Sequence, residues 1–144
     1  ANYKIVKIDH AMATHDANIA RFQQWWTRAT RAGHAIGQRA YLNGKSAQRD
    51  CVRERNSTVF WGIALPGVIV ATALPSQGIS LVMLGAYILL GYRVWRYRRN
   101  QGDARNDALL YTKFLLLAKF ANGVGLLRFF VNRMARRYQI IEYK

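Results

Sequence analysis

The sequence predicts a mainly α-helical membrane protein, in which a two-helix transmembrane hairpin is flanked by cytoplasmic amphipathic helices and preceded by one short strand. Three observations lead to this fold class. Two apolar runs lie only a few residues apart, arginines stand on both outer sides of the pair, and the 144 residues carry a formal net charge of +15. The single cysteine excludes an internal disulfide.

The two apolar runs occupy residues 57–74 and 78–95, within a hairpin that covers residues 57–99. The first run has no ionisable side chain and, as a helix, just crosses a hydrocarbon core about 30 Å thick. The second run contains one charged residue, Arg93, whose long side chain can reach the headgroups. Either run alone could be a buried core helix, but the close pair favours two membrane spans. We expect a bend at Pro66, which cannot donate a helical hydrogen bond.

The arginines predict the orientation of the hairpin, because basic residues beside short loops stay in the cytoplasm. The turn between the runs is uncharged, whereas both outer flanks are basic, with Arg49, Arg53 and Arg55 before the first run and Arg93, Arg96, Arg98 and Arg99 after the second. We therefore expect a multi-pass protein with both termini in the cytoplasm. Charges placed beside spans favour a bilayer with anionic headgroups as the partner, and not nucleic acid.

Residues 1–56 form two predicted segments. Residues 1–18 contain a short strand followed by a polar loop, and because a lone strand has nothing to pair with, we expect them to be the end of a larger sheet domain. Residues 19–56 predict an amphipathic, interfacial helical segment. Its helix begins near Ile19, carries Phe22 and Trp26 on one apolar face, and ends at Asn43–Gly44.

Residues 100–144 predict one or more cytoplasmic interfacial helices and a C-terminal tail, with Asp107 as the N-cap. The part from 108 to 131 is apolar enough for a third span, and both alternatives stay open. Its lysines and arginine favour a helix lying on the membrane. The glycines and asparagine of residues 122–125 could break that helix in two.

A longer ordered pattern runs through the chain. Its parts are His15-Asp16-Ala17, Arg21-Phe22, Gln24-Trp25-Trp26, Arg28, Arg31-Ala32-Gly33-His34-Ala35, Gly44, the hairpin and Ile140-Ile141-Glu142-Tyr143-Lys144. This combination resembles the C-terminal part of bacterial membrane-anchored family 2 glycosyltransferases. These are inverting enzymes in which a nucleotide-sugar-binding GT-A domain precedes transmembrane helices. The resemblance implies that the chain lies in the bacterial inner membrane and that residues 1–18 end a GT-A catalytic domain.

The resemblance also implies a metal-dependent reaction whose main groups are not in this sequence. The donor-binding Asp-x-Asp and the catalytic base of the family precede the segment with which this chain begins, so we expect the chain alone to be inactive. The leaving diphosphate is neutralised by a divalent cation, Mg²⁺ or Mn²⁺. By position, His15 is the candidate ligand for this metal or the diphosphate, since a neutral imidazole binds such ions.

Gln24, Trp25 and Trp26 are the candidate acceptor-binding residues. An aromatic ring can cover the apolar face of a pyranose, and a glutamine can bond its hydroxyls. Tandem tryptophans among arginines are equally suited to anchoring a helix at the membrane interface, and this alternative stays open. Arg21, Arg28 and Arg31 are candidates for contact with anionic lipid or phosphate.

These observations lead to one main hypothesis and one alternative. The main hypothesis is the membrane-anchoring, acceptor-side portion of a glycosyltransferase that transfers a sugar from a nucleotide-sugar to a lipid-linked or polysaccharide acceptor at the cytoplasmic membrane face. The alternative is a non-enzymatic basic membrane-hairpin subunit or scaffold. No other catalytic signature, such as a phosphate-binding glycine-rich loop or a zinc-protease motif, occurs in the sequence.

Overall fold

The computed structural model describes residues 19–136, which are mainly helical and contain no strand. The mainly helical fold class is therefore confirmed, whereas the strand expected near the N-terminus and the tail after residue 136 lie outside the described residues. The elements are α1 (Phe22–Asn43), α2 (Val52–Val59), the π-helical turn η1 (Phe60–Ala64), α3 (Leu65–Ala73), the 3-10 helix η2 (Ile79–Leu84), α4 (Gly85–Asn100) and α5 (Arg105–Met134).

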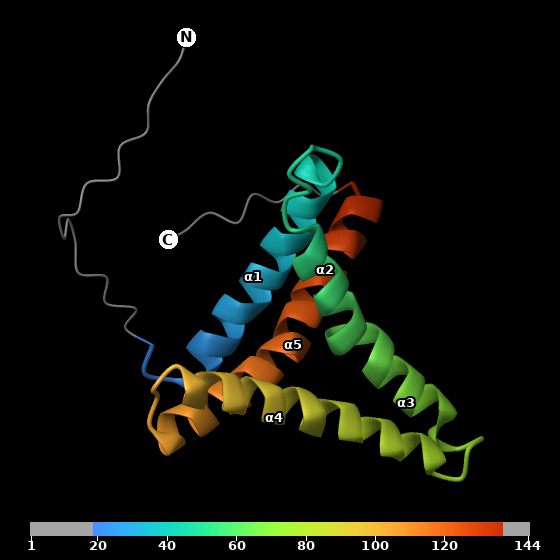
Figure 1. Cartoon of the computed structure of the whole chain (residues 1–144). Helices are drawn as coiled ribbons and strands as arrows, with labels where there is room; N and C mark the ends of the chain where they lie inside the picture. Colours follow the sequence, from blue (N-terminus) through green and yellow to red (C-terminus); the bar gives the residue numbers. More distant parts are fainter. Residues whose placement is uncertain (1–18, 137–144) are drawn as a thin grey trace, which may run out of the picture.

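The helices enclose a triangle (Figure 1). The continuous helix made of α2, η1 and α3 forms one side, η2 with α4 forms the second, and α5 forms the third, with α1 lying along α5. Three helices, Val52–Ala73, Ile79–Asn100 and Arg105–Met134, are long and apolar enough to cross a membrane by length and composition. Two of them contain the predicted runs, and the third contains the segment for which a span and an interfacial helix were both considered.

The most extensive helix pair is α1 with α5, and it contains much of the core. The buried side of α1 consists of small residues, namely Thr30, Gly33, Gly37 and Ala40. A Cβ atom at Gly33 would overlap the backbone of Asn122, and a Cβ atom at Gly125 would overlap the backbone of Thr30. The two backbones thus touch where both helices lack side-chain bulk, an arrangement typical of glycine-mediated helix packing.

This packing corrects the predicted face of the first helix. Phe22 is 55% exposed and Trp26 is half-buried, so the expected aromatic stripe does not form the buried face. The helix also begins at Phe22, three residues after the expected start, with Arg21 at the N-cap position. Its predicted end is confirmed, since the Gly44 N–H donates to the Ala40 carbonyl at 3.1 Å.

The first predicted span is one helix that accommodates Pro66 through η1. In this turn the Leu65 N–H donates to the Phe60 carbonyl five residues back, and Pro66 has no N–H to offer. The Trp61 carbonyl consequently loses both possible backbone donors. The Tyr87 hydroxyl replaces them, donating to the Trp61 carbonyl at 2.5 Å. At Pro66, for which we predict a bend, the structure shows a π-helical turn within one continuous helix.

The two predicted spans meet at the expected turn but do not pack side by side. Residues 74–78 form the turn, and Gly78 adopts φ +87°, a conformation that glycine tolerates best. Close to it, α3 contacts η2, and the Ser80 hydroxyl donates to the Ile69 carbonyl at 3.3 Å. α3 has no backbone contact with α4, so the structure does not confirm a closely packed hairpin.

The third apolar helix is continuous, which decides between the one-helix and the two-helix alternatives and leaves the predicted cap to be corrected. α5 runs through residues 122–125 without a break, because Gly123 and Gly125 lie at close helix crossings where a larger residue would clash. Asp107 is not the N-cap, since Ala104 occupies that position. Asp107 lies in the first helical turn, where its negative charge interacts favourably with the positive end of the helix dipole.

We expect Gly33→Ala to destabilise the fold by about 1–3 kcal/mol, because the added methyl group would push α1 away from α5. The free energy of unfolding in detergent, followed by circular dichroism, measures this effect. Gly85→Ala is the matched control, since no atom lies within 4 Å of a Cβ placed there. Equal stability of the two variants would contradict the close packing of α1 on α5.

Candidate functional site

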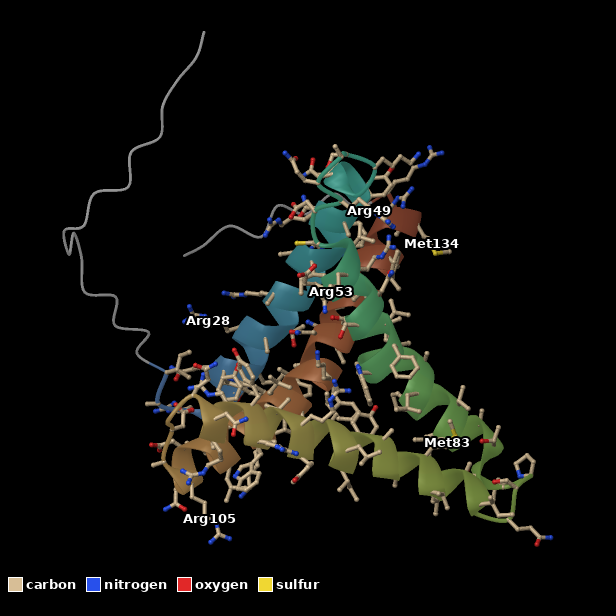
Figure 2. All side chains as sticks on the ribbon, viewed as in Figure 1. Arg28, Arg49, Arg53, Met83, Arg105 and Met134 are labelled. Atoms are coloured by element: carbon tan, nitrogen blue, oxygen red, sulfur yellow. The ribbon has the colours of Figure 1, made fainter. Side chains whose placement is uncertain are left out.

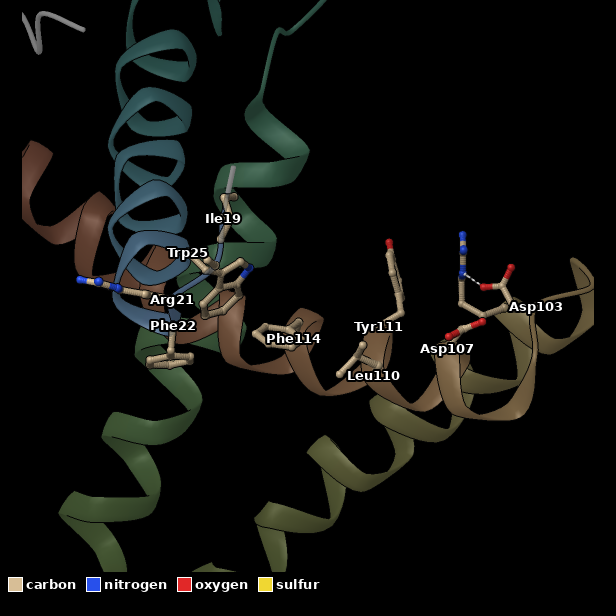
Figure 3. A pocket seen from close by; sticks show the side chains of 11 residues that line it. Ile19, Arg21, Phe22, Trp25, Asp103, Asp107, Leu110, Tyr111 and Phe114 are labelled. Atoms are coloured by element: carbon tan, nitrogen blue, oxygen red, sulfur yellow. Dashed lines mark hydrogen bonds and ion pairs between the residues drawn. The ribbon is translucent and has the colours of Figure 1, made fainter. Parts of the chain in front are cut away.

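An open cavity of about 730 Å³ lies where the beginning of α1 meets the end of α4 and the beginning of α5 (Figure 3). Three separate segments contribute to it because the chain returns at residue 98 to the place where α1 begins. The lining residues are Ile19, Ala20, Arg21, Phe22, Trp25, Arg98, Asp103, Asp107, Leu110, Tyr111 and Phe114. We call this cavity the corner pocket.

One wall of the corner pocket is aromatic. The rings of Trp25 and Phe114 meet edge to face, with centroids 4.9 Å apart, and Phe22 lies 5.4 Å from Trp25. Trp25 and Phe114 are both half-buried, and both line the pocket. Such a fixed aromatic wall can hold a flat, partly apolar ligand.

The opposite wall is polar and held by hydrogen bonds. The Arg98 Nε donates to the Asp103 Oδ2 at 2.5 Å, while the Arg99 Nη1 donates to the Asp103 carbonyl at 2.6 Å. The Arg98 guanidinium also lies over the ring of Tyr111, 4.5 Å from its centroid. These bonds close the turn between α4 and α5. Asp107, one helical turn before Tyr111, forms no ion pair among the described residues.

The structure separates the predicted acceptor residues. Trp25 lines the corner pocket, but Trp26 does not, and it packs against Phe22 with ring centroids 6.0 Å apart. The Gln24 Oε1 accepts hydrogen bonds from the backbone N–H groups of Ala20 and Arg21 at 3.1 and 3.0 Å. Gln24 therefore caps the start of α1, as expected for a glutamine three residues after the N-cap.

The predicted cationic residues are also divided. Arg21 lines the corner pocket, whereas Arg28 and Arg31 are exposed on α1 outside it. His15 lies outside the described residues. Within residues 19–136 no three His, Cys, Asp or Glu side chains gather into a group that could hold a metal ion. The expectation of Mg²⁺ or Mn²⁺ thus stays a prediction that concerns the segment before α1.

Sequence reasoning missed the contribution of α5 to this pocket. Asp107, Leu110, Tyr111 and Phe114 recur at helical spacings of i, i+3, i+4 and i+7, which places them on one face of α5. That periodicity was available in the sequence. It could not be connected with Trp25, because nothing in the sequence shows that α5 returns to lie beside α1.

Another polar contact closes the loop after α1, at a different corner of the triangle. Arg39 and Asp50 form a two-bond ion pair, with its shorter bond at 2.9 Å. Partial burial raises the pKa of Asp50, but the hydrogen bond and charge of Arg39 outweigh it, so the net effect is a lowered pKa. Burial raises the pKa of the neighbouring Cys51 thiol. The thiol therefore stays protonated at neutral pH, unlike a reactive cysteine.

Comparison with known proteins adds no relative. No family model matches the chain, and neither the curated proteins nor the solved structures contain a match.

We expect Gln24→Ala to destabilise the first turn of α1 by about 1 kcal/mol, because two backbone donors lose their acceptor. Gln24→Glu should keep the cap, since a carboxylate also accepts both hydrogen bonds. Hydrogen exchange at the first turn of α1 measures the difference, and the exposed neighbour variant Gln23→Ala is the control. Unchanged exchange in Gln24→Ala would show that this side chain does not cap the helix.

Proposed function

We propose that this chain is the membrane-anchoring and acceptor-side part of an inverting glycosyltransferase at the cytoplasmic face of the bacterial inner membrane. The full protein would transfer a sugar from a nucleotide-sugar to a lipid-linked or polysaccharide acceptor. The supporting observation is that Arg21 and Trp25, two residues of the family-like pattern, line the corner pocket. Ile19, the first residue in the sequence that lines this pocket, follows His15 by only four residues.

The shape of the molecule limits how it can sit in a bilayer. Three sides of a triangle cannot all run along the membrane normal, although each is apolar enough to cross. α5 is the side that does not cross in our proposal, because α1 is packed along it and carries the exposed residues Arg21, Arg28 and Arg31. A spanning α5 would carry these charges into the bilayer, at about 2.5–3.5 kcal/mol for each arginine near its centre.

The distribution of exposed side chains supports this placement. The corner where α3 meets η2 is apolar and open to its surroundings, with exposures of 76% at Val70, 90% at Leu74, 74% at Ile79 and 78% at Val82. Arginines mark the other two corners. Figure 2 shows Arg105 at one of them and Arg49 at the other, with Met83 toward the apolar corner. In a bilayer the apolar corner would lie in the hydrocarbon region, and the basic corners would contact anionic headgroups.

The proposed reaction divides between this chain and the catalytic domain that would precede it. His15 is the residue of this chain proposed to hold a divalent cation, which would supply the positive charge that neutralises the leaving diphosphate. Trp25 and the rest of the corner pocket orient the acceptor. Holding the acceptor hydroxyl close to the donor sugar lowers the entropic part of the barrier to transfer. Deprotonation of the acceptor hydroxyl belongs to the upstream carboxylate. Arg28 and Arg31 attract anionic lipid or a lipid-linked phosphate to the surface of α1.

The membrane placement can be tested with single cysteines introduced at Asn106 and Met134, near the two ends of α5, in a Cys51→Ser background. We expect a membrane-impermeant maleimide to label both positions in inside-out vesicles and neither in right-side-out vesicles, because α5 lies along the cytoplasmic face. The Ser76→Cys variant, whose cysteine lies in the apolar corner, should not be labelled in inside-out vesicles. Labelling of Asn106→Cys and Met134→Cys from opposite sides would show that α5 crosses the membrane.

The transferase proposal requires a GT-A domain with an Asp-x-Asp in the reading frame before Ala1. In membranes that contain the resulting protein, we expect Trp25→Ala to lower kcat/KM for the acceptor about tenfold, through loss of aromatic contact. Trp26→Ala is the control and should stay within about twofold, because Trp26 lies outside the corner pocket.

Two results would contradict this proposal. A start codon a few residues before Ala1, without a glycosyltransferase gene beside it, would favour the membrane scaffold. Equal losses of transfer in the Trp25→Ala and Trp26→Ala variants would favour membrane anchoring by both tryptophans. His15→Ala should reduce turnover while leaving membrane association unchanged, and a change in association alone would remove His15 from the metal site.

A further inference from the structure

We infer that the corner pocket binds an uncharged sugar ring, and that the aromatic and carboxylate side chains of α5 supply part of the recognition. Calling this sugar the acceptor rests on the proposed function, but sugar binding itself does not. The volume of the corner pocket, about 730 Å³, falls within the range of roughly 300–1,000 Å³ that is usual for small-molecule sites.

The charge of the corner pocket favours a neutral ligand. The whole chain has 22 basic and 7 acidic residues, yet the pocket is lined by two of each, Arg21 and Arg98 with Asp103 and Asp107. Arg98 is already paired with Asp103, and the Arg21 side chain extends away from the other labelled side chains of the pocket (Figure 3). A phosphate group entering the pocket would meet the carboxylate of Asp107, which has no cationic partner among the residues 19–136. Like charges in such a site disfavour binding, so a sugar phosphate fits this pocket poorly.

The chemistry of the lining matches the two sides of a pyranose. The ring C–H groups of a sugar form an apolar face that can lie against Trp25 and Phe114, whose rings are held edge to face. The hydroxyl groups are hydrogen-bond donors, and Asp107 offers two acceptor oxygens with lone pairs. A charge-assisted hydrogen bond of this kind is stronger than one to a neutral acceptor.

The pocket also differs from the motif that first suggested acceptor binding. Gln24 is occupied as a helix cap and does not line the cavity, and neither does Trp26. Of the three candidates only Trp25 remains. The polar recognition that the motif assigned to Gln24 is supplied by Asp107 from α5 and by the Arg98–Asp103 pair between α4 and α5.

The test uses the full 144-residue chain in nanodiscs and two matched probes, methyl glucopyranoside and glucose 1-phosphate. Saturation-transfer difference NMR detects their binding, and the displacement of one probe by the other ranks them. We expect the uncharged glycoside to bind several-fold more tightly. N-acetylglucosamine serves as a second neutral probe and detects binding if the pocket prefers a sugar that carries an amide group.

Variants then locate the site. Trp25→Ala and Asp107→Ala should each weaken glycoside binding about tenfold, a change that corresponds to about 1.4 kcal/mol. Trp26→Ala and Gln23→Ala, which alter α1 outside the pocket, should leave glycoside binding unchanged. Asp107→Asn keeps the shape and one acceptor oxygen, so it should weaken the glycoside less than Asp107→Ala and should reduce the discrimination against glucose 1-phosphate. Circular dichroism of each variant confirms that the helices have formed.

Tighter binding of glucose 1-phosphate, or glycoside binding that is insensitive to Trp25 and Asp107, would overturn the inference. Each result is distinguishable from failure of the proposed function. A chain that binds glycosides through Trp25 and Asp107, but whose upstream frame encodes no transferase, would support the sugar site and remove the enzyme. Acceptor-dependent transfer by the full protein, without glycoside binding in the corner pocket, would support the enzyme and remove the sugar site.

Discussion

The close, parallel contact of α1 with α5 is the constraint on which the rest of the structure depends. The pairs Trp25–Phe114, Gly33–Asn122 and Gly37–Leu126 keep one constant offset along the two helices. Because glycines on both helices let the backbones touch, a shift of one turn would place side chains in the contact and separate them. The glycine contacts near the middle therefore determine that Trp25 meets Phe114 at the end. The corner pocket is a consequence of this register.

A second, smaller contact holds the triangle together on its inner side. The backbones of η1 and α5 meet at Gly62 and Gly123, where a Cβ atom on either residue would overlap the other helix. The Tyr87 hydroxyl on α4 reaches the Trp61 carbonyl that Pro66 leaves without a backbone donor, and the Tyr87 ring stacks on Phe120 of α5. One proline thus creates an unsatisfied acceptor that joins two sides of the triangle to the third. This need for a donor is stronger in a lipid environment, where water cannot supply one.

Composition and periodicity predicted the helices but not their arrangement. Two apolar runs separated by Pro75 and Gly78 indicate two helices and a turn, and Asn43–Gly44 indicates a helix end, because these features are local. The buried face of α1 was assigned to its aromatic residues, although the spacing of Gly33 and Gly37 was visible in the sequence. Large apolar residues normally mark the buried face in water, whereas small residues mark it where helices approach closely.

The candidate site shows the same limit more sharply. Arg21 and Trp25 could be selected from their sequence pattern, and both line the corner pocket. Asp107 was interpreted as a helix cap, which is the usual role of an aspartate before an apolar helix. Its place in the same pocket as Trp25 depends on a contact between segments more than 80 residues apart in the sequence. Local rules contain no information about such a contact.

The proposed membrane placement and the proposed sugar site depend on the same geometry. The pocket lies at a basic corner, and not at the apolar corner, because α4 ends with Arg98 and Arg99 and α5 begins with Arg105. If basic corners lie at the headgroups, the pocket opens at the membrane surface, where the first sugar of a lipid-linked glycan would be found. The phosphates of such a molecule would then lie among the surface arginines outside the pocket. Under the proposed function, a neutral pocket within a strongly basic corner would separate the two parts of one ligand, with the sugar ring inside the pocket and the phosphate charge outside it.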